Sequence, residues 1–144
     1  MFIRSIHQIG WADSPCLPLL LNPISAGFPS PADDFLQSIL DLQEALVPRP
    51  TATFMMRVKG HSMTGCGIHS GDLLIVDRSI DPVDGAVVIA VLEGEFTVKR
   101  FRKSGGRIML VAENPDFPPI VVSQEMDFYI WGVVTFNVHG HGIH

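Results

Sequence analysis

A succession of short β-prone segments, separated by turns rich in glycine, proline and acidic residues, fills the chain from Thr53 to Val138. Glu93-Gly94 separates two of these segments and is typical of a tight hairpin turn. Short strands that are so closely connected predict a mostly β domain. We expect the strands at residues 53–59, 72–77, 87–92, 95–101, 107–112, 120–123 and 128–138.

One helix is expected before these strands. Ser30 can cap it, Pro31 fits its first turn, and Asp33 stands where a capping acid is found. A single apolar stripe follows at helical spacing, and two prolines then end the helix. These residues are Phe35, Ile39, Leu42 and Leu46, followed by Pro48 and Pro50.

The first 30 residues have a different character from the rest. They contain four prolines and show no sustained hydrophobic period of a strand or a helix. We therefore expect residues 1–30 to form an irregular arm with short extended pieces, and residues 31–144 to form the folded domain.

Composition limits the function. The chain has 144 residues, enough for one domain with its own core, and with 47% hydrophobic and only 17% charged residues it is not a disordered chain. Its net charge is -5 and it has no basic cluster, so a direct electrostatic grip on nucleic acid is not expected.

Export and membrane insertion are not expected either. No apolar run approaches the roughly 18 residues of a membrane span. The apolar stretch 16–24 is interrupted by prolines, which disfavours a signal peptide. Cys16 and Cys66 are too few for a disulfide framework and form no CxxC pair. A cytoplasmic chain with two thiols is the simplest interpretation.

Ser62 is the first candidate for chemistry. It lies between a predicted strand and a glycine-rich stretch, residues 60–71, where a serine is presented on a tight loop. Glycines in such a loop let a substrate approach the backbone and let amides face a developing oxyanion. A serine hydroxyl is inert at neutral pH, so it needs a base.

Lys99 is a candidate for that base. It lies inside an apolar hairpin strand, and Thr97 and Phe101 are its neighbours on the same face. Partial burial disfavours an ammonium group and lowers its pKa toward the range in which a neutral amine accepts a proton.

Simpler interpretations are open for the same residue types. A Gly-x-Ser in a loop is more often a plain turn, and a lysine in a strand more often faces solvent. His61 adjoins Ser62, but neighbouring residues tend to point apart, which disfavours His61 as the base. His139, His141 and His144 form a tail without a companion acid, more typical of a frayed end than of a metal site. No metal and no cofactor are therefore expected.

Four sequence blocks, taken in order, carry a family resemblance. They are Gly60-His61-Ser62-Met63, Gly67-Ile68, Gly71-Asp72-Leu73-Leu74-Ile75-Val76-Asp77 and Gly94-Glu95-Phe96-Thr97-Val98-Lys99. Together they resemble the serine–lysine self-cleaving domain of the LexA and UmuD family, and the resemblance spans about residues 26–138. The 37 residues that separate Ser62 from Lys99 suit that pattern.

The resemblance implies a fold and a set of site residues. The fold is the compact LexA-type C-terminal protease fold, with short, strongly bent antiparallel strands, one short helix and a cleavable N-terminal arm. Ser62 is the nucleophile, Lys99 is the base, and the backbone amides of Ser62 and Met63 are the oxyanion donors. Residues 26–33 resemble the cleavage segment of UmuD, which places the scissile bond between Ala26 and Gly27.

The residues before the expected scissile bond distinguish the UmuD-like subgroup from the LexA-like subgroup. UmuD proteins commonly have Cys-Gly there, whereas Ala26-Gly27 is the LexA pair. However, the 26 preceding residues are rich in proline and have Arg4 as their single basic residue, so they supply no recognition helix. A type I signal peptidase also uses serine and lysine, but it needs a membrane anchor. The UmuD-like interpretation is favoured.

For a UmuD-like protein, the resemblance implies a role in SOS mutagenesis. A RecA-type filament on single-stranded DNA promotes self-cleavage. The product that starts at Gly27 forms a homodimer and joins a UmuC-type Y-family translesion polymerase, without sequence-specific DNA contacts of its own. Alternatives are a non-catalytic adaptor β domain, a LexA-like regulator without its DNA-binding domain, and a stand-alone peptidase that acts on other proteins.

Overall fold

The fold was analysed in a computed structural model, which describes residues 1–8, 16–20, 26 and 37–142. The chain divides into two compact units. The first comprises Met1–Gly10 and Arg49–His144, and the second comprises Trp11–Pro48. We describe each unit by itself.

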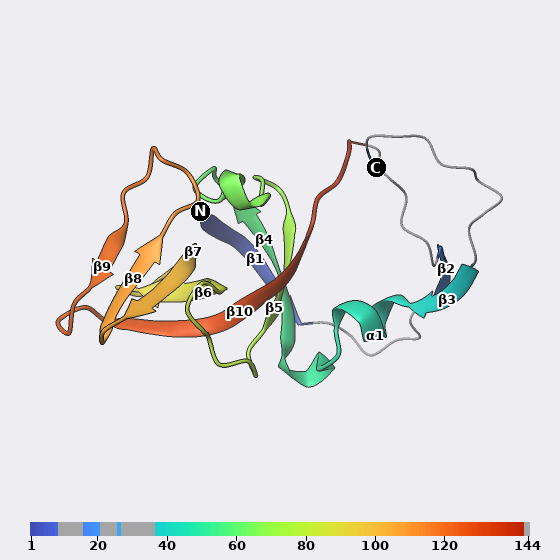
Figure 1. The fold of residues 1–144 in the computed structure, drawn as a ribbon, viewed down its shortest axis with the longest axis horizontal. Coiled ribbons are helices and arrows are strands. Elements are labelled where there is room, and N and C mark those ends of the chain that lie inside the picture. The colour runs from blue at the N-terminus through green and yellow to red at the C-terminus, as the bar shows by residue number, and fades with distance from the viewer. Residues whose placement is uncertain (9–15, 21–25, 27–36, 143–144) are drawn as a thin grey trace. The chain divides into compact units, whose positions relative to one another are not determined.

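The first unit is built on one eight-stranded sheet (Figure 1). Its strand order is β1-β4-β5-β10-β6-β7-β8-β9, and every neighbouring pair is antiparallel. The strands are β1 (Phe2–Gln8), β4 (Thr53–Lys59), β5 (Leu73–Asp77), β6 (Val87–Leu92), β7 (Glu95–Ser104), β8 (Arg107–Val111), β9 (Ile120–Val122) and β10 (Phe128–Val138). The predicted mostly β fold of antiparallel strands is confirmed. The seven strands predicted after residue 52 are all present.

The β6–β7 hairpin shows how local sequence sets the register. Glu93 and Gly94 both have positive φ angles, 50° and 80°, which a two-residue turn of the primed type requires. Leu92 therefore pairs with Glu95, and the register continues to Val88 opposite Lys99. The turn thus fixes which residue faces Lys99 across the sheet.

Strand β10 joins the two halves of the sheet because it pairs with β5 on one side and with β6 on the other (Figure 1). Its register shifts between Ile130 and Gly132 and again between Val134 and Phe136. Irregularities of this kind bend a strand and increase its twist. They let one strand of 11 residues serve two differently oriented groups of strands.

Two buried apolar clusters lie against this sheet. The first cluster contains Met1, Met56, Val58, Met63, Ile68, Leu74, Val76, Ile89 and Val98. The second contains Val88, Ala90, Phe101, Leu110 and Val133. Strands β6 and β7 contribute to both clusters, because successive strand residues face opposite sides. Both hairpin strands are therefore held from two sides.

Strand β1 was not among the predicted strands. It pairs along β4, from Phe2 opposite Lys59 to Gln8 opposite Phe54, so these residues of the expected arm belong to the main sheet. A register shift between Ile3 and Ser5 interrupts the alternation that would have marked the strand in the sequence. The predicted arm boundary at residue 30 falls among residues that the structure does not describe.

In the second unit, the helix is shorter than the sequence predicted. The described residues contain a short α1 (Leu42–Leu46), capped by the Asp41 side chain, which accepts a hydrogen bond from the backbone N–H of Glu44. The preceding β3 (Gln37–Asp41) pairs with β2 (Cys16–Leu20), although its sequence belongs to the helical stripe. Strand pairing overrides a helical pattern of this length, because propensity is a weak preference. The helix start at residues 30–36 lies outside the described residues.

Gly132 offers a test of the β10 bend. A Cβ atom at this position would lie 2.6 Å from Cγ1 of the fully buried Val76. Gly132→Ala is therefore expected to lower the free energy of unfolding by about 1–3 kcal/mol, as overpacking does. Urea denaturation measures it, with the exposed Ser104→Ala as control, expected within about 0.5 kcal/mol of the parent. An unchanged free energy for Gly132→Ala would show that the strand relaxes freely at this point.

Candidate active site

Ser62 lies in the loop that follows β4, and its side chain is fully buried. Gly60 allows the sharp exit from the strand, with a φ of +112°, and a 3-10 turn at Thr64–Cys66 follows. Gly67 ends that turn in a left-handed conformation, φ +86°. The glycine-rich sequence thus folds into a compact loop that holds the serine hydroxyl against the sheet.

Lys99 reaches Ser62 from a strand that is not adjacent to β4 in the sheet order. It lies in β7, is only 7% exposed, and its Nζ donates a hydrogen bond to Ser62 Oγ at 3.1 Å. Burial lowers the pKa of Lys99 below its ordinary value, while a hydrogen bond with the N-terminal amine acts in the opposite direction. The two residues that the sequence singled out are therefore in direct contact.

The N-terminus of the chain is the third group at this point. The Met1 amine donates a hydrogen bond to Ser62 Oγ at 2.8 Å. Its pKa is lowered to about 6, first by burial and then by the Lys99 charge and hydrogen bond. The Met1 carbonyl accepts from the Val98 N–H and the Thr97 hydroxyl, each at 3.4 Å. Two amines with lowered pKa values therefore share one hydroxyl oxygen.

A second loop, which begins after β8, supports the Ser62 loop. The Asn114 amide donates to the His61 carbonyl at 2.9 Å, and the Gly65 N–H donates to the Glu113 carbonyl at 2.7 Å. A Cβ on Gly65 would lie 2.5 Å from that Glu113 oxygen, so only glycine allows this approach. The Phe117 ring lies 5.7 Å from Lys99 Nζ. The spacing of residues along the sequence did not indicate that these residues support the Ser62 loop.

The backbone amides of Ser62 and Met63 form no hydrogen bond to any described residue, since neither is a donor among the loop contacts. Unpaired N–H groups beside a buried hydroxyl are suited to an oxyanion. The His61 side chain is exposed, and within the described residues its contacts to this loop go through its carbonyl.

The histidines near the C-terminus gather elsewhere. Nδ1 of His139 lies 2.5 Å from Oδ1 of the buried Asp72, and the rings of His69 and His141 neighbour His139. Burial alone would raise the pKa of Asp72, but hydrogen bonds from the His69 N–H, His139 and Asn137 lower it. No group of three potential metal ligands occurs among the described residues.

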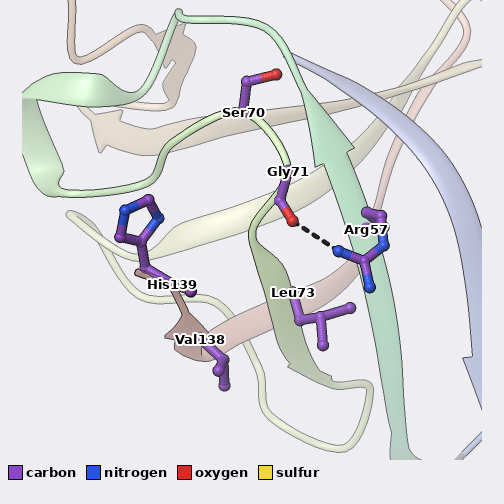
Figure 2. Close-up of a pocket in the computed structure, with 7 residues that line it drawn as sticks. Arg57, Ser70, Gly71, Leu73, Val138 and His139 are labelled. Atoms are coloured by element: carbon purple, nitrogen blue, oxygen red, sulfur yellow. Dashed lines mark hydrogen bonds between the residues drawn. The ribbon is translucent and has the colours of Figure 1, made fainter. Parts of the chain in front are cut away.

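A surface pocket adjoins this histidine cluster (Figure 2). His139, Val138 and Leu73 line one part of it, and the Arg57 guanidinium donates to the Gly71 carbonyl at 2.8 Å. Neither Ser62 nor Lys99 lines this pocket. It is therefore separate from the buried serine.

The expected cleavage site lies in the second unit. Ala26 is exposed and lies in a bend of the backbone. Gly27, the other residue of the expected scissile bond, lies outside the described residues. Among the described residues, no helix is long and apolar enough to cross a membrane.

Comparison with known proteins decides the family. A family model described as Peptidase S24-like matches residues 18–135. The chain belongs to this family. The expected resemblance is confirmed, and the family is one of serine peptidases.

The relatives are similar over most of their length. The chain is 44% identical over 122 residues to protein SamA of Salmonella typhimurium, covering 85% of this chain and 84% of that protein. It is 42% identical over 128 residues to protein MucA of Escherichia coli, covering 88% and 87%. It is also 42% identical over 139 residues to the LexA repressor of Dechloromonas aromatica, covering 96% of this chain but 65% of the repressor.

Proposed function

We propose that this S24 peptidase cuts its own Ala26–Gly27 bond with Ser62 as nucleophile and Lys99 as general base. The observation that carries the proposal is the 3.1 Å contact between Lys99 Nζ and Ser62 Oγ in a buried setting. A serine nucleophile and its base must lie within hydrogen-bond distance. Family membership supports the reaction class, and the contact between the two side chains supports the proposed roles.

Burial is what makes a lysine suitable as the base. An ordinary lysine is charged at neutral pH and cannot accept a proton. Lys99 is 7% exposed, and burial lowers its pKa because an ammonium group is poorly solvated there. No described carboxylate forms an ion pair with it. The lowered pKa favours the neutral amine relative to an ordinary lysine, and this amine faces the hydroxyl of Ser62.

The reaction follows in two steps. Neutral Lys99 takes the proton of Ser62, and Ser62 Oγ forms a bond to the carbonyl carbon of Ala26. The amides of Ser62 and Met63 donate to the resulting oxyanion. The C–N bond then breaks, and Lys99 returns the proton to the nitrogen of Gly27. In the second step Lys99 takes a proton from water, whose oxygen forms a bond to the ester carbonyl carbon. The bond between that carbon and Ser62 Oγ then breaks, Lys99 returns the proton to Ser62 Oγ, and Ala26 is left with a free carboxyl group.

The substrate segment is part of the same chain or of a second copy. Tethering a segment to its enzyme gives a high effective concentration, so the site needs little binding energy of its own. Small residues on both sides of the bond suit a nucleophile that is held in a narrow, buried place. Cleavage rates that scale with protein concentration distinguish the reaction between chains from the reaction within one chain.

The biological role is proposed from the resemblance. A RecA-type filament on single-stranded DNA promotes the docked state of the arm, and the cleaved chain forms a homodimer that joins a UmuC-type polymerase in SOS mutagenesis. The low charge and the net charge of -5 fit a protein that reaches DNA through such partners. A cytoplasmic location fits these partners.

One prediction of the proposed function concerns cleavage of the Ala26–Gly27 bond. Intact mass spectrometry after incubation at alkaline pH, or with recombinase, nucleotide and single-stranded DNA, is expected to show fragments that end at Ala26 and begin at Gly27. Ser62→Ala is expected to stop cleavage, because no other hydroxyl donates to or accepts from Lys99 among the described residues. Lys99→Met is expected to slow it by about 100-fold or more.

His61→Ala is the matched control, since that side chain is exposed. It is expected to cut at nearly the parent rate. Cutting at the same bond in Ser62→Ala would eliminate the proposed nucleophile, and a parent chain that stays intact under both conditions would eliminate self-cleavage.

Another prediction concerns how the rate of cleavage depends on pH. A lysine with a lowered pKa loses its proton at a lower pH than an ordinary lysine, and the neutral form is the base. The rate is therefore expected to rise with pH and to level off below the ordinary lysine pKa of about 10.4. A rate that falls as pH rises would contradict Lys99 as the base. Circular dichroism over the same range checks that the fold persists.

A further inference from the structure

The carbonyl of His61, which directly precedes Ser62 in the chain, accepts a hydrogen bond from outside the Ser62 loop. The Asn114 side-chain amide donates to it at 2.9 Å. The other donors to this carbonyl are the N–H and the hydroxyl of Thr64, which belong to the same loop as Ser62. Among the described residues, Asn114 is therefore the contact that ties this carbonyl to another part of the unit.

The peptide group between His61 and Ser62 links this contact to the nucleophile. The His61 carbonyl and the Ser62 N–H belong to one peptide group, which is planar and stiff. The described residues contain no cis peptide bond, so the two groups point in opposite directions. A hydrogen bond that fixes the carbonyl therefore also fixes the direction of the Ser62 N–H. That N–H forms no hydrogen bond to a described residue and is one of the two expected oxyanion donors.

Asn114 is suited to this task because both ends of its side-chain amide are bound. Its Nδ2 donates to the His61 carbonyl, and its Oδ1 accepts from the Asp116 N–H at 2.9 Å. Its backbone carbonyl accepts from the Phe117 N–H at 3.1 Å, which closes a turn. An aspartate in this position keeps an acceptor for the Asp116 N–H but has no donor for the His61 carbonyl.

The loop that carries Asn114 is anchored to the strand that carries Lys99. Glu113 forms an ion pair with Arg100, which follows Lys99 in β7. The Arg100 guanidinium also donates to the Gly85 carbonyl at 2.6 Å, and both charged side chains are partly buried. Charge-assisted hydrogen bonds of this kind hold a defined geometry. A chain of contacts thus runs from β7 through Glu113 and Asn114 to the peptide group before Ser62.

We propose that Asn114 is a positioning residue of the self-cleavage reaction, that it orients the Ser62 N–H toward the developing oxyanion, and that the Arg100–Glu113 ion pair holds Asn114 in place. This inference rests on the proposed peptidase function. Asn114 forms no described hydrogen bond with Lys99 or with the Ser62 hydroxyl. It therefore acts on the reaction through the oxyanion donor and not through the base.

The central test removes the donor of Asn114. A serine-reactive fluorophosphonate labels Ser62, and its phosphoryl oxygen takes the place of the oxyanion. In Asn114→Asp, the maximal labelling rate at saturating probe is expected to fall at least about tenfold, while the probe concentration for half of that rate changes less than about twofold. Asn114→Ala introduces no charge and is expected to show at least the same loss. Cleavage at Ala26–Gly27 is expected to slow by a similar factor.

Thr64→Val is the matched control, because it removes a hydrogen bond to the same carbonyl from within the loop. Its maximal labelling rate is expected to stay within about twofold of the parent rate. Urea denaturation checks that every variant is folded under the labelling conditions. Parent-like maximal rates in both Asn114 variants would overturn the proposed role, and so would an equal loss in Thr64→Val.

A combination of substitutions tests the ion pair. Glu113→Ala alone is expected to lower the maximal labelling rate about threefold or more, but less than about twofold when Asn114→Ala is already present, since the ion pair acts through Asn114. Glu125→Ala removes an exposed carboxylate and is expected to label like the parent. Effects of Glu113→Ala and Asn114→Ala that simply multiply would show that the ion pair does not act through Asn114.

The two proposals fail differently. If Ser62 of the parent is not labelled and no chain is cut at Ala26–Gly27, the proposed function fails and the role of Asn114 fails with it. If the parent is labelled and cut but the Asn114 variants react at the parent rate, the function stands and the positioning role is wrong.

Discussion

The structure around the site depends on one interaction, the contact of a buried lysine amine with a buried serine hydroxyl. Removing Lys99 from water disfavours its charge, and a hydroxyl offers no negative charge to restore it. The buried position of Lys99 therefore disfavours its charged form, and the proposed role as a proton acceptor depends on this effect. Strand β7 can hold it because two apolar clusters fix the hairpin from both sides. The sheet thus supplies the rigidity that an unfavourable lysine position requires.

The loop and the N-terminus complete this arrangement in different ways. Contacts from Asn114 and Glu113 hold the Ser62 loop from outside, and Gly65 permits the close approach. Met1 holds the hydroxyl from the other direction with a second amine of lowered pKa. Ser62 is thus held by contacts from two loops and by two amines among the described residues.

Much of the fold was predictable because the strands after residue 52 are short β-prone runs bounded by clear turns, such as Glu93-Gly94 between β6 and β7. The pairing of Ser62 with Lys99 was predictable only from the family pattern, since spacing along the chain does not place a loop against a strand. The helix before residue 48 was overestimated because pairing of β3 with β2 overrides the apolar stripe. Strand β1 escaped notice because its register shift breaks the alternation, and the Met1 contact depends entirely on tertiary structure.

The most direct test of the central claim is covalent labelling of Ser62 by a serine-reactive fluorophosphonate, followed by peptide mass spectrometry as pH is raised. The account predicts that the parent is labelled at Ser62, faster at higher pH, and that Lys99→Met is labelled about 100-fold more slowly or less. Labelling of Ser62 at the same rate in both proteins would contradict the account, because the hydroxyl would then be activated without Lys99.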